Sequence, residues 1–515
     1  MTRTFTMDEP DTRNRLDDML QGVIGTPCDR LDGAAKVTGT ATYAAEYQIE
    51  GCLDAVLVTA TIAKGEVTDI DEASVLRMPG VIAVLCDPRM TTRSAQGGAG
   101  KAPTQNPQEI DYYGQPVALV VAESFEQARH AAKYLKISYR EDSDAVFDPH
   151  VAAAPVEEQT GKSEIKGNLD RAMREAEHAV DVTYTTEGHN SAPMEPHAAM
   201  AQWDGETLTV HLSMQMLKYN VKELADAVGL KPQNVRLISR YVGGGFGSKL
   251  GITAEAVAAS LAAMALNRPV RAVMLRQQVF QSVMRRSETS QRLRLAAKAD
   301  GRLAGFGHEA LVSNLPGESF AEPVTQASKF LYRGDDRTIR LELARVNRLT
   351  AGSVRAPGEA VGMLALECAM DELANEIGID PVELRLRNIP GRHPTRDIPY
   401  SPRNFAECIT LGAERFGWDG ADRKPCQRRE GEWWIGTGMA SAARVHNLNE
   451  AQARVRLCAD GTAIIESDMT DIGTGTYTVL GQIAAEMLGL RLEDVLVRLG
   501  DTAFPPGAGS GGRWG

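Results

Sequence analysis

Residues 235–249 read Val235-Arg-Leu-Ile-Ser-Arg-Tyr-Val-Gly-Gly-Gly-Phe-Gly-Ser-Lys249, and this stretch decides the fold. Its first eight residues are typical of a buried β-strand, and the alanine-rich run 253–266 predicts a helix. Between them, three consecutive glycines lack Cβ atoms, so the backbone can take positive φ and bring N–H groups close to a ligand. The unpaired N–H groups of a helix start favour an anion. The stretch therefore predicts a loop that holds an anionic group.

Two familiar phosphate loops do not match this stretch. A Walker A loop needs a second glycine where Ser248 stands, and a hydroxyl residue where Leu250 follows Lys249. A dinucleotide-binding fingerprint needs glycine or alanine at the place of Ser248. A plain strand-to-helix turn stays open as the alternative.

Composition sets limits on the class of protein. A chain of 515 residues suggests roughly three domains. The net charge of −12 argues against a basic surface for nucleic acid. Seven scattered cysteines without a C-x-x-C pair predict reduced thiols and no zinc or iron–sulfur site on this chain. The polar start lacks a signal-peptide core and the apolar runs are short, so we expect a cytoplasmic protein without a membrane span.

Turn signals and hydrophobic periodicity divide the chain into successive units. The expected order is a polar N-terminal arm (1–24), a unit of alternating strands and helices (25–145), a linker (146–166), a second unit (167–395) and a third (396–515). In the first unit, strands are expected at 55–59, 81–85, 116–121 and 135–139, and Ser124 is the expected cap of a helix. The glycine-rich run 96–101 is interpreted as a flexible insertion.

Two groups of polar residues in the second unit leave alternatives open. His189, Glu195 and His197 could suggest a metal site, but neighbouring prolines forbid a single helical face, which favours a structural role. Arg355 precedes Pro357 at an expected helix start. It could clamp an oxyanion or pair with Glu359.

Residues 204–250 and 460–512 share one order of parts. Each has an Asp-Gly turn, a strand, a helix that ends in Gly-Leu, a second strand and a glycine loop. The second copy adds Gly473-Thr474-Gly475 before its helix. Two glycine loops from duplicated halves predict one elongated anionic ligand held between them.

Six motifs, in order along essentially the whole chain, resemble the landmarks of the molybdenum subunits of the xanthine dehydrogenase and aldehyde oxidase family. They are 30–43 (Arg-Leu-Asp-Gly to Thr-Tyr), 194–197 (Met-Glu-Pro-His), 243–247 with 355–360 (Arg-Ala-Pro-Gly-Glu-Ala), 471–478 and 509–512 (Gly-Ser-Gly-Gly). The chain looks most like the molybdenum subunit of bacterial periplasmic aldehyde oxidoreductases. The resemblance implies an α+β (mixed α/β) fold, with an N-terminal hammerhead-like domain followed by two molybdopterin-binding α/β domains, the second incomplete.

The resemblance also implies a cofactor, Mo-molybdopterin cytosine dinucleotide, and its binding residues. Gln215 would hydrogen-bond the molybdenum centre, and Gly245, Phe246 and Gly247 would lie beside the molybdenum and pterin. The remaining residues expected to bind the cofactor are Arg355, Gly473, Thr474 and Gly475. Arg444 matches an active-site arginine of such enzymes, where a cation would steady an oxyanion; a surface pair with Glu450 is the alternative.

The implied activity is oxidation of an aldehyde to a carboxylic acid, with water as the oxygen source. An N-heterocycle such as a purine is the alternative substrate, and a non-catalytic remnant is the alternative role. Family members carry a catalytic glutamate in a Gly-Val-Gly-Glu segment near their C-terminus, and this sequence contains no such segment. We therefore expect a truncated or split subunit that is slow or inactive alone.

The implied partners follow from the electron path, since no iron–sulfur or flavin motif occurs in the sequence. They are a small [2Fe-2S] subunit and an FAD subunit of a hetero-oligomer. Export to the periplasm with a signal-bearing partner is the alternative to a cytoplasmic location.

Overall fold

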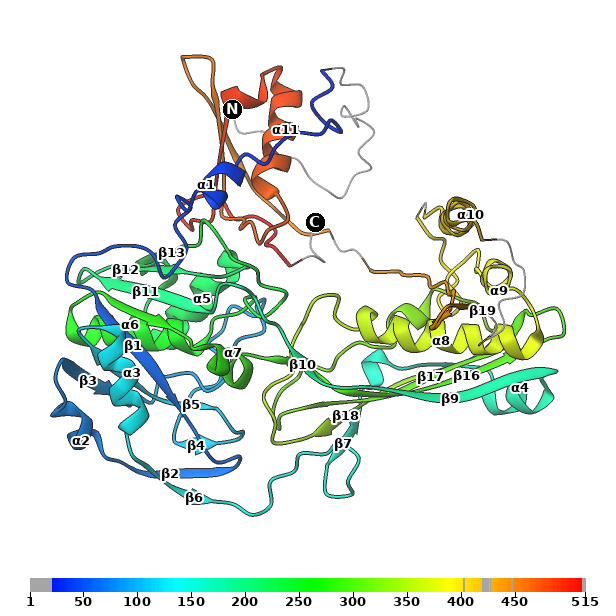
Figure 1. The fold of residues 1–515 in the computed structure, drawn as a ribbon, viewed down its shortest axis with the longest axis horizontal. Coiled ribbons are helices and arrows are strands. Elements are labelled where there is room, and N and C mark those ends of the chain that lie inside the picture. The colour runs from blue at the N-terminus through cyan, green and yellow to red at the C-terminus, as the bar shows by residue number, and fades with distance from the viewer. Residues whose placement is uncertain (1–20, 402, 419–425, 427, 446–447, 512–515) are drawn as a thin grey trace.

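The computed structural model describes residues 21–401, 403–418, 426, 428–445 and 448–511 (Figure 1). Most of the predicted polar arm, His446 and residues 512–515 lie outside the described part. Three β-sheets with their own helices form the body of the molecule, two large ones side by side and a small one above them in Figure 1. Within the described residues, we find no helix long and apolar enough to cross a membrane.

The first sheet joins the first and second predicted units. Its strands β1 and β14 run parallel, with Leu53 opposite Val270, so strands from both sides of the expected linker share one hydrogen-bonded surface. In spatial order the strands are β13 (Val235–Ile238), β12 (Leu208–Leu212), β11 (Ala198–Trp203), β14 (Val270–Val273), β1 (Leu53–Thr59), β5 (Pro116–Ala122) and β3 (Val81–Leu85). The helices of this lobe are α2 (Glu72–Leu76), α3 (Phe125–Tyr134), α5 (Leu217–Val228), α6 (Ala254–Leu266) and α7 (Arg276–Ser282), and α1 (Gly33–Val37) lies above the lobe in Figure 1.

The alanine-rich helix α6 lies at the centre of the first lobe. It packs on β11 and β14, and ten of its thirteen residues are buried, so it needs no polar face. The predicted helix at 253–266 is therefore confirmed, and so is the Ser124 cap of α3, whose hydroxyl accepts from the backbone N–H of Gln127. The predicted strand at 235–242 is shorter in the structure, because β13 ends at Ile238.

Three short strands form a small sheet at the lower edge of the first lobe in Figure 1, and two more pair between the two large lobes. These strands are β4 (Glu109–Ile110), β2 (Gly65–Ile70) and β6 (Ile137–Glu141), and then β10 (His189–Asn190) with β15 (Arg285–Arg286). The glycine-rich run 96–101, interpreted above as a flexible insertion, is anchored at its start. Ala95 donates its N–H to Ile252 O at 2.9 Å, and the backbone of Gly97 lies against Leu250.

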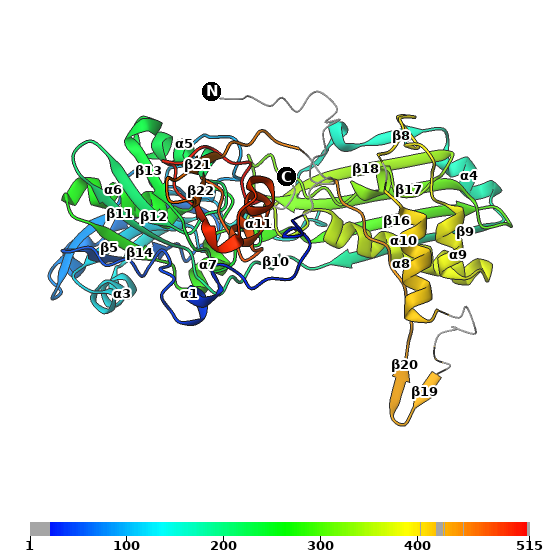
Figure 2. The ribbon, with the colours of Figure 1, turned by 90° about the horizontal axis from the view of Figure 1, so that it is seen from above.

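The second large sheet carries α8 (Glu359–Ile377) along one face (Figure 1). Its strands are β7 (Val156–Glu158), β18 (Asp336–Arg345), β17 (Leu303–Asn314), β16 (Thr289–Ala297) and β9 (His178–Thr186), with β8 (Glu164–Lys166) also on β18. The predicted linker therefore contains two strands, β7 and β8. An edge strand pairs through its backbone and needs no apolar side chains, so its polar sequence gave no strand signal. The other helices of this lobe are α4 (Leu169–Glu175), α9 (Pro381–Arg387) and α10 (Phe405–Phe416), and a hairpin of β19 (Arg428–Glu430) and β20 (Trp433–Ile435) projects from it (Figure 2).

The third sheet repeats part of the first. Its strands β21 (Arg454–Leu457), β22 (Ala463–Ser467) and β23 (Val495–Leu499) are packed on α11 (Thr476–Leu488). In each copy, an antiparallel pair leads through a helix and a 3₁₀ turn to a parallel strand: β11–β12–α5–β13 in the first and β21–β22–α11–β23 in the second. Leu208 faces Val235 in one copy and Ala463 faces Val495 in the other. The predicted internal repeat is confirmed.

Candidate functional site

One buried residue joins the glycine loops of the two repeats. Gln215, between β12 and α5, accepts a hydrogen bond from the backbone N–H of Gly247 at 3.1 Å and donates its side-chain amide to Ser510 O at 2.7 Å. Its backbone carbonyl accepts from the N–H of Ser510 at 2.9 Å, and its own N–H donates to Lys249 O at 2.8 Å. We call this set of contacts the Gln215 junction. The two glycine loops therefore lie side by side rather than on opposite sides of the molecule.

Close approach at the junction explains why glycines stand there. A Cβ on Gly245 would lie 2.3 Å from Oε1 of Gln215, and one on Gly247 would lie 1.7 Å from Ser353 O. Gly247 also has φ of +99°, which L side chains rarely adopt. Any larger residue would separate the loop from Gln215 and from the turn at 353–358.

Phe246 lies between these glycines in a strained conformation. Its φ is 54°, in the left-handed region that a bulky residue seldom takes, and its side chain remains 41% exposed. Its carbonyl accepts the N–H of Arg355 at 2.9 Å. The fold therefore holds an aromatic ring at the surface of the loop instead of burying it. An exposed, strained aromatic residue on a fixed loop is suited to covering a flat ligand.

A buried ionic cluster fixes the base of the loop. The ammonium of Lys249 lies 2.9 Å from a carboxylate oxygen of Glu195 and 2.7 Å from the hydroxyl of Ser213. The same oxygen of Glu195 accepts the N–H of Gly243 at 2.7 Å. Desolvation lowers the pKa of Lys249, while the carboxylate of Glu195 opposes that shift. A buried charge is costly unless it is paired, so these contacts are needed to keep the lysine inside.

The histidines of the metal-site alternative bind protein groups. Nε2 of His197 lies 2.9 Å from Ser248 O, and burial lowers the pKa of His197 to about 3. The ring is therefore neutral near pH 7 and carries its hydrogen on Nε2. His189 accepts a hydrogen bond from Nε of Arg286 at 3.1 Å. Both histidines therefore have hydrogen-bond partners within the protein.

The turn at 353–358 is held from below by Arg286, a residue that the sequence did not single out. Its guanidinium donates to Val354 O at 2.8 Å and Arg355 O at 2.5 Å, and pairs with Glu322 at 2.6 Å. Glu322 in turn accepts the N–H of Gly358 at 2.6 Å. Burial raises the pKa of Glu322 to about 7, and Arg286 opposes that rise. No local signal marks these residues, because tens of residues separate Arg286 from the turn.

Two exposed arginines, Arg355 and Arg444, had acidic residues nearby in the sequence as alternative ion-pair partners. Within the described part of the chain, Arg355 makes no ion pair with Glu359, and Arg444 makes none with Glu450. Arg444 lies in the extended segment between β20 and β21, and no described hydrogen bond links it to Gln215. The structure therefore does not bring Arg444 into contact with the junction.

The starts of α6 and α11 already meet acidic side chains of the protein. Helix α6 begins at Ala254, well beyond Gly247, and its first turn contains the fully buried Glu255. At α11, Oδ1 of Asp471 accepts the N–H groups of Gly473 and Gly475 at 2.7 and 3.3 Å. Six residues separate Gly247 from the start of α6. Thr474 remains exposed.

The fold and the paired glycine loops define a cofactor-binding protein of mixed α/β architecture, and comparison with known proteins gives its family. The family model for the "Aldehyde oxidase and xanthine dehydrogenase, a/b hammerhead domain" matches residues 38–143. "Molybdopterin cofactor-binding domain" matches residues 121–389 and 411–514. The chain belongs to the xanthine dehydrogenase and aldehyde oxidase family and carries molybdopterin cofactor-binding domains. The predicted family and fold class are confirmed.

Two proteins of known function and one solved structure are similar to almost the whole chain. The chain is 42% identical, over 520 residues, to the aldehyde oxidoreductase molybdenum-binding subunit PaoC of Escherichia coli (strain K12), covering 99% of this chain and 69% of PaoC. It is 28% identical to the nicotine 6-hydroxylase large subunit of Paenarthrobacter nicotinovorans, over 95% of this chain and 65% of that protein. The aldehyde oxidoreductase from Desulfovibrio desulfuricans superimposes with a TM-score of 0.82 at 22% identity, over 95% of this chain and 58% of that one. This last likeness concerns the fold alone.

Proposed function

We propose that the chain is the molybdenum-cofactor-binding subunit of an aldehyde oxidoreductase, which oxidises aldehydes to carboxylic acids. The observation that carries the proposal is the Gln215 junction, where the glycine loops of both repeats meet at one buried amide. The similarity to PaoC favours an aldehyde over an N-heterocycle, since the nicotine hydroxylase is the more distant of the two relatives. When bound, the cofactor supplies a two-electron oxidation for which water provides the oxygen.

The residues present fit a molybdopterin that brings its own metal ligands. Within the described residues, no group of three His, Cys, Asp or Glu side chains could hold a metal ion. A metal held by the sulfur atoms of a cofactor needs no such group from the protein. The glycine loop at 243–247 offers a backbone surface without side chains other than the ring of Phe246. Such a surface suits the flat pterin.

The proposed cofactor is Mo-molybdopterin cytosine dinucleotide, and each residue has a definite task. Gln215 orients the molybdenum end while it holds the two loops together, and Gly245, Phe246 and Gly247 cover the pterin. The residues that would hold the polar remainder of the cofactor are Arg355, Gly473, Thr474 and Gly475. Arg444 would steady the negative charge that develops on an aldehyde oxygen.

The proposed partners accept the two electrons. They are a small [2Fe-2S] subunit and an FAD subunit, and the location is the cytoplasm or, with a signal-bearing partner, the periplasm.

Cofactor content tests the proposal without requiring turnover. The chain is expressed with an intact supply of molybdenum cofactor, and molybdenum and CMP released by acid are measured per chain. We expect about one of each in the wild type and a large loss in Gln215→Ala, with Gln233→Ala on the surface as the matched control. Wild-type protein that contains neither molybdenum nor CMP would contradict the proposal. Incubating the assembled complex with aldehydes and with purine-like heterocycles then identifies the substrate class.

A further inference from the structure

Between β20 and β21 the chain crosses from the second large sheet to the third sheet, and Arg444 belongs to this crossing (Figure 1). Its described residues, 436–445 and 448–453, form no helix or strand. We call residues 436–453 the crossing segment. A segment without regular hydrogen bonds of its own keeps one conformation only if other parts of the protein hold it. The place of Arg444 therefore depends on the contacts at the two ends of the crossing segment.

A buried ion pair holds the end of the crossing segment that lies on the second lobe. Nε of Arg385 in α9 lies 2.7 Å from Oε2 of Glu367 in α8, and both side chains are buried. The same carboxylate oxygen accepts the backbone N–H of Ser441 at 2.6 Å. The other oxygen accepts the hydroxyl of Tyr332 at 2.7 Å, and Arg385 also donates to Met439 O at 3.4 Å. One carboxylate and one guanidinium therefore fix the backbone at two places in the crossing segment.

The surroundings of this ion pair are apolar, so packing alone does not explain the two charges. Leu366, Leu373 and Leu384 of the same core are fully buried. Removing two charges from water costs about as much as their attraction returns, and apolar residues of similar volume often stabilise a core as well or better. What Glu367 and Arg385 add is a set of hydrogen-bonding groups for a segment that has no secondary structure. Their specific contribution is therefore the contact with the crossing segment.

The other end of the crossing segment is fixed beside the second glycine loop. Gln452 donates its N–H to Pro506 O at 2.8 Å. Pro506 directly precedes the loop 507–511, which meets the Gln215 junction. The crossing segment therefore runs from the buried ion pair to the proposed cofactor site, and Arg444 stands between its two anchors.

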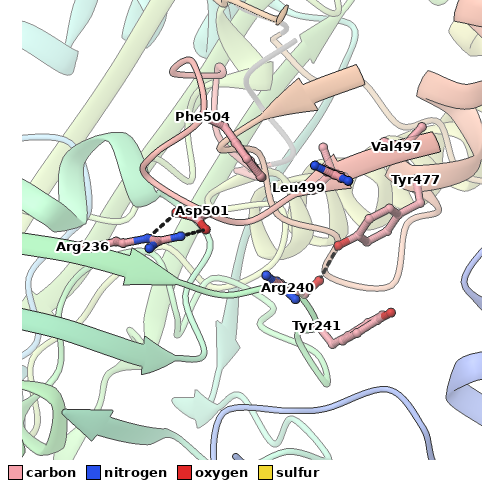
Figure 3. Close-up of a pocket in the computed structure, with 9 residues that line it drawn as sticks. Arg236, Arg240, Tyr241, Tyr477, Val497, Leu499, Asp501 and Phe504 are labelled. Carbon is pink, nitrogen blue, oxygen red and sulfur yellow. Dashed lines mark hydrogen bonds and ion pairs between the residues drawn. The ribbon is translucent and has the colours of Figure 1, made fainter. Parts of the chain in front are cut away.

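The backbone that receives Gln452 is itself attached to the first lobe. Asp501 accepts two hydrogen bonds from the guanidinium of Arg236 in β13, at 3.1 and 2.8 Å (Figure 3). Ser239, just after β13, donates its N–H to Gly500 O at 2.7 Å. One end of the crossing segment is thus fixed on the second lobe, and the other on a loop that the first lobe holds.

We propose that Glu367 and Arg385 are positioning residues that hold Arg444 for the proposed aldehyde oxidation. They act through the backbone, because they bind Ser441 and Arg444 follows three residues later. A cation that steadies a developing oxyanion is effective when it is already in place, since no reorganisation is then needed during the reaction. The inference rests on the proposed function, which gives Arg444 its task.

Proline at position 441 tests the contact, because Ser441→Pro removes the N–H that Glu367 accepts and leaves the ion pair in place. Aldehyde oxidation by the assembled, cofactor-loaded complex is measured over a range of aldehyde concentrations. Displacement of a catalytic group by about 1 Å can cost about a hundredfold, so we expect kcat to fall by about tenfold to a hundredfold. KM should change little, because the arginine acts on charge that develops in the reaction. Thr437→Pro is the matched control, since the N–H of Thr437 is exposed and makes no hydrogen bond with the described residues.

A double-mutant cycle separates positioning from a general loss of structure. Ser441→Pro should have no further effect on kcat in Arg444→Ala, because the positioned side chain is then absent. Arg385→Lys, which keeps the charge but lacks the planar fork, is a second variant and should give a smaller loss that likewise disappears in Arg444→Ala. Thermal melting and molybdenum content show that each variant is folded and loaded.

The outcomes distinguish this inference from the proposed function. Wild-type kcat in folded, loaded Ser441→Pro, or an equal loss with and without Arg444, would overturn the positioning role alone. Faster hydrogen exchange in 439–445 of the cofactor-free Ser441→Pro chain would support the anchor without any turnover, and unchanged exchange would refute it. A loaded wild-type complex that oxidises no aldehyde would instead refute the proposed function, and the positioning role with it.

Discussion

Replacing Gln215 with methionine removes the side-chain hydrogen bonds of the Gln215 junction while keeping its volume. The side-chain bonds to Gly247 N–H and Ser510 O are lost, and the two backbone bonds of residue 215 remain. Gln215 is only 3% exposed, so water does not readily replace the missing partner. The substitution therefore leaves one buried donor and one buried acceptor unsatisfied.

The magnitude follows from those two groups. Each unsatisfied buried polar group costs about 1–3 kcal/mol, so the junction should weaken by roughly 2–4 kcal/mol after partial relaxation. The effect is local, because the substitution removes one hydrogen bond within the first lobe and one between Gln215 and Ser510. Opening of the Gly247 amide should therefore become about thirtyfold to several hundredfold more frequent.

Native-state hydrogen exchange measures this directly. We expect faster exchange in peptides that contain Gly247 and Ser510, and unchanged exchange in β16 and β17 of the second sheet. Gln233→Met, on the surface, is the matched control. If the Gln215→Met chain is folded and both peptides exchange at the wild-type rate, the junction is not what holds the loops together.

Three further perturbations test the surroundings of the site. Lys249→Met leaves the carboxylate of Glu195 without its cation, and urea unfolding should show a loss of about 3–5 kcal/mol that the exposed Lys298→Met does not show. Arg286→Met frees the turn at 353–358, and we expect a comparable loss together with reduced molybdenum content; Arg286→Lys should recover only part of it, since an ammonium lacks the planar fork that reaches two carbonyls and a carboxylate. Burial raises the pKa of Glu255 from 4.5 to about 7, so the folded state binds more protons than the unfolded state, and wild-type stability should fall relative to Glu255→Gln as pH rises from 4.5 to 7. If the stability difference between wild type and Glu255→Gln stays constant across that pH range, Glu255 does not have the raised pKa.

The sequence predicted those features of the fold that depend on a local pattern of residues. The alanine-rich run, the Ser124 cap and the repeat of strand, helix and glycine loop all lie within short windows, and the structure contains each of them. The family followed from motifs in order, and Gln215 was singled out by resemblance. Its bridging role between the two loops depends on a contact that spans 295 residues, which no local pattern reveals.

The missed features have a common physical cause. Arg286 and Glu322 support the turn at 353–358 through contacts across more than thirty residues, and each looks like an ordinary charged residue in the sequence. The strands β7 and β8 pair through their backbones at a sheet edge, so their side chains carry no apolar alternation. At the start of α6, where an anion was expected, the first turn contains Glu255, whose complete burial cannot be seen in the sequence.

The central claim is that the two glycine loops hold one ligand together, and hydrogen exchange on cofactor loading tests it most directly. Exchange is compared between cofactor-free chain and chain loaded with the molybdenum cofactor. The claim predicts slower exchange in both 243–249 and 507–511 upon loading, and loss of protection in both segments in Gln215→Met. Protection of one segment alone, with the other exchanging as in the cofactor-free chain, would contradict it.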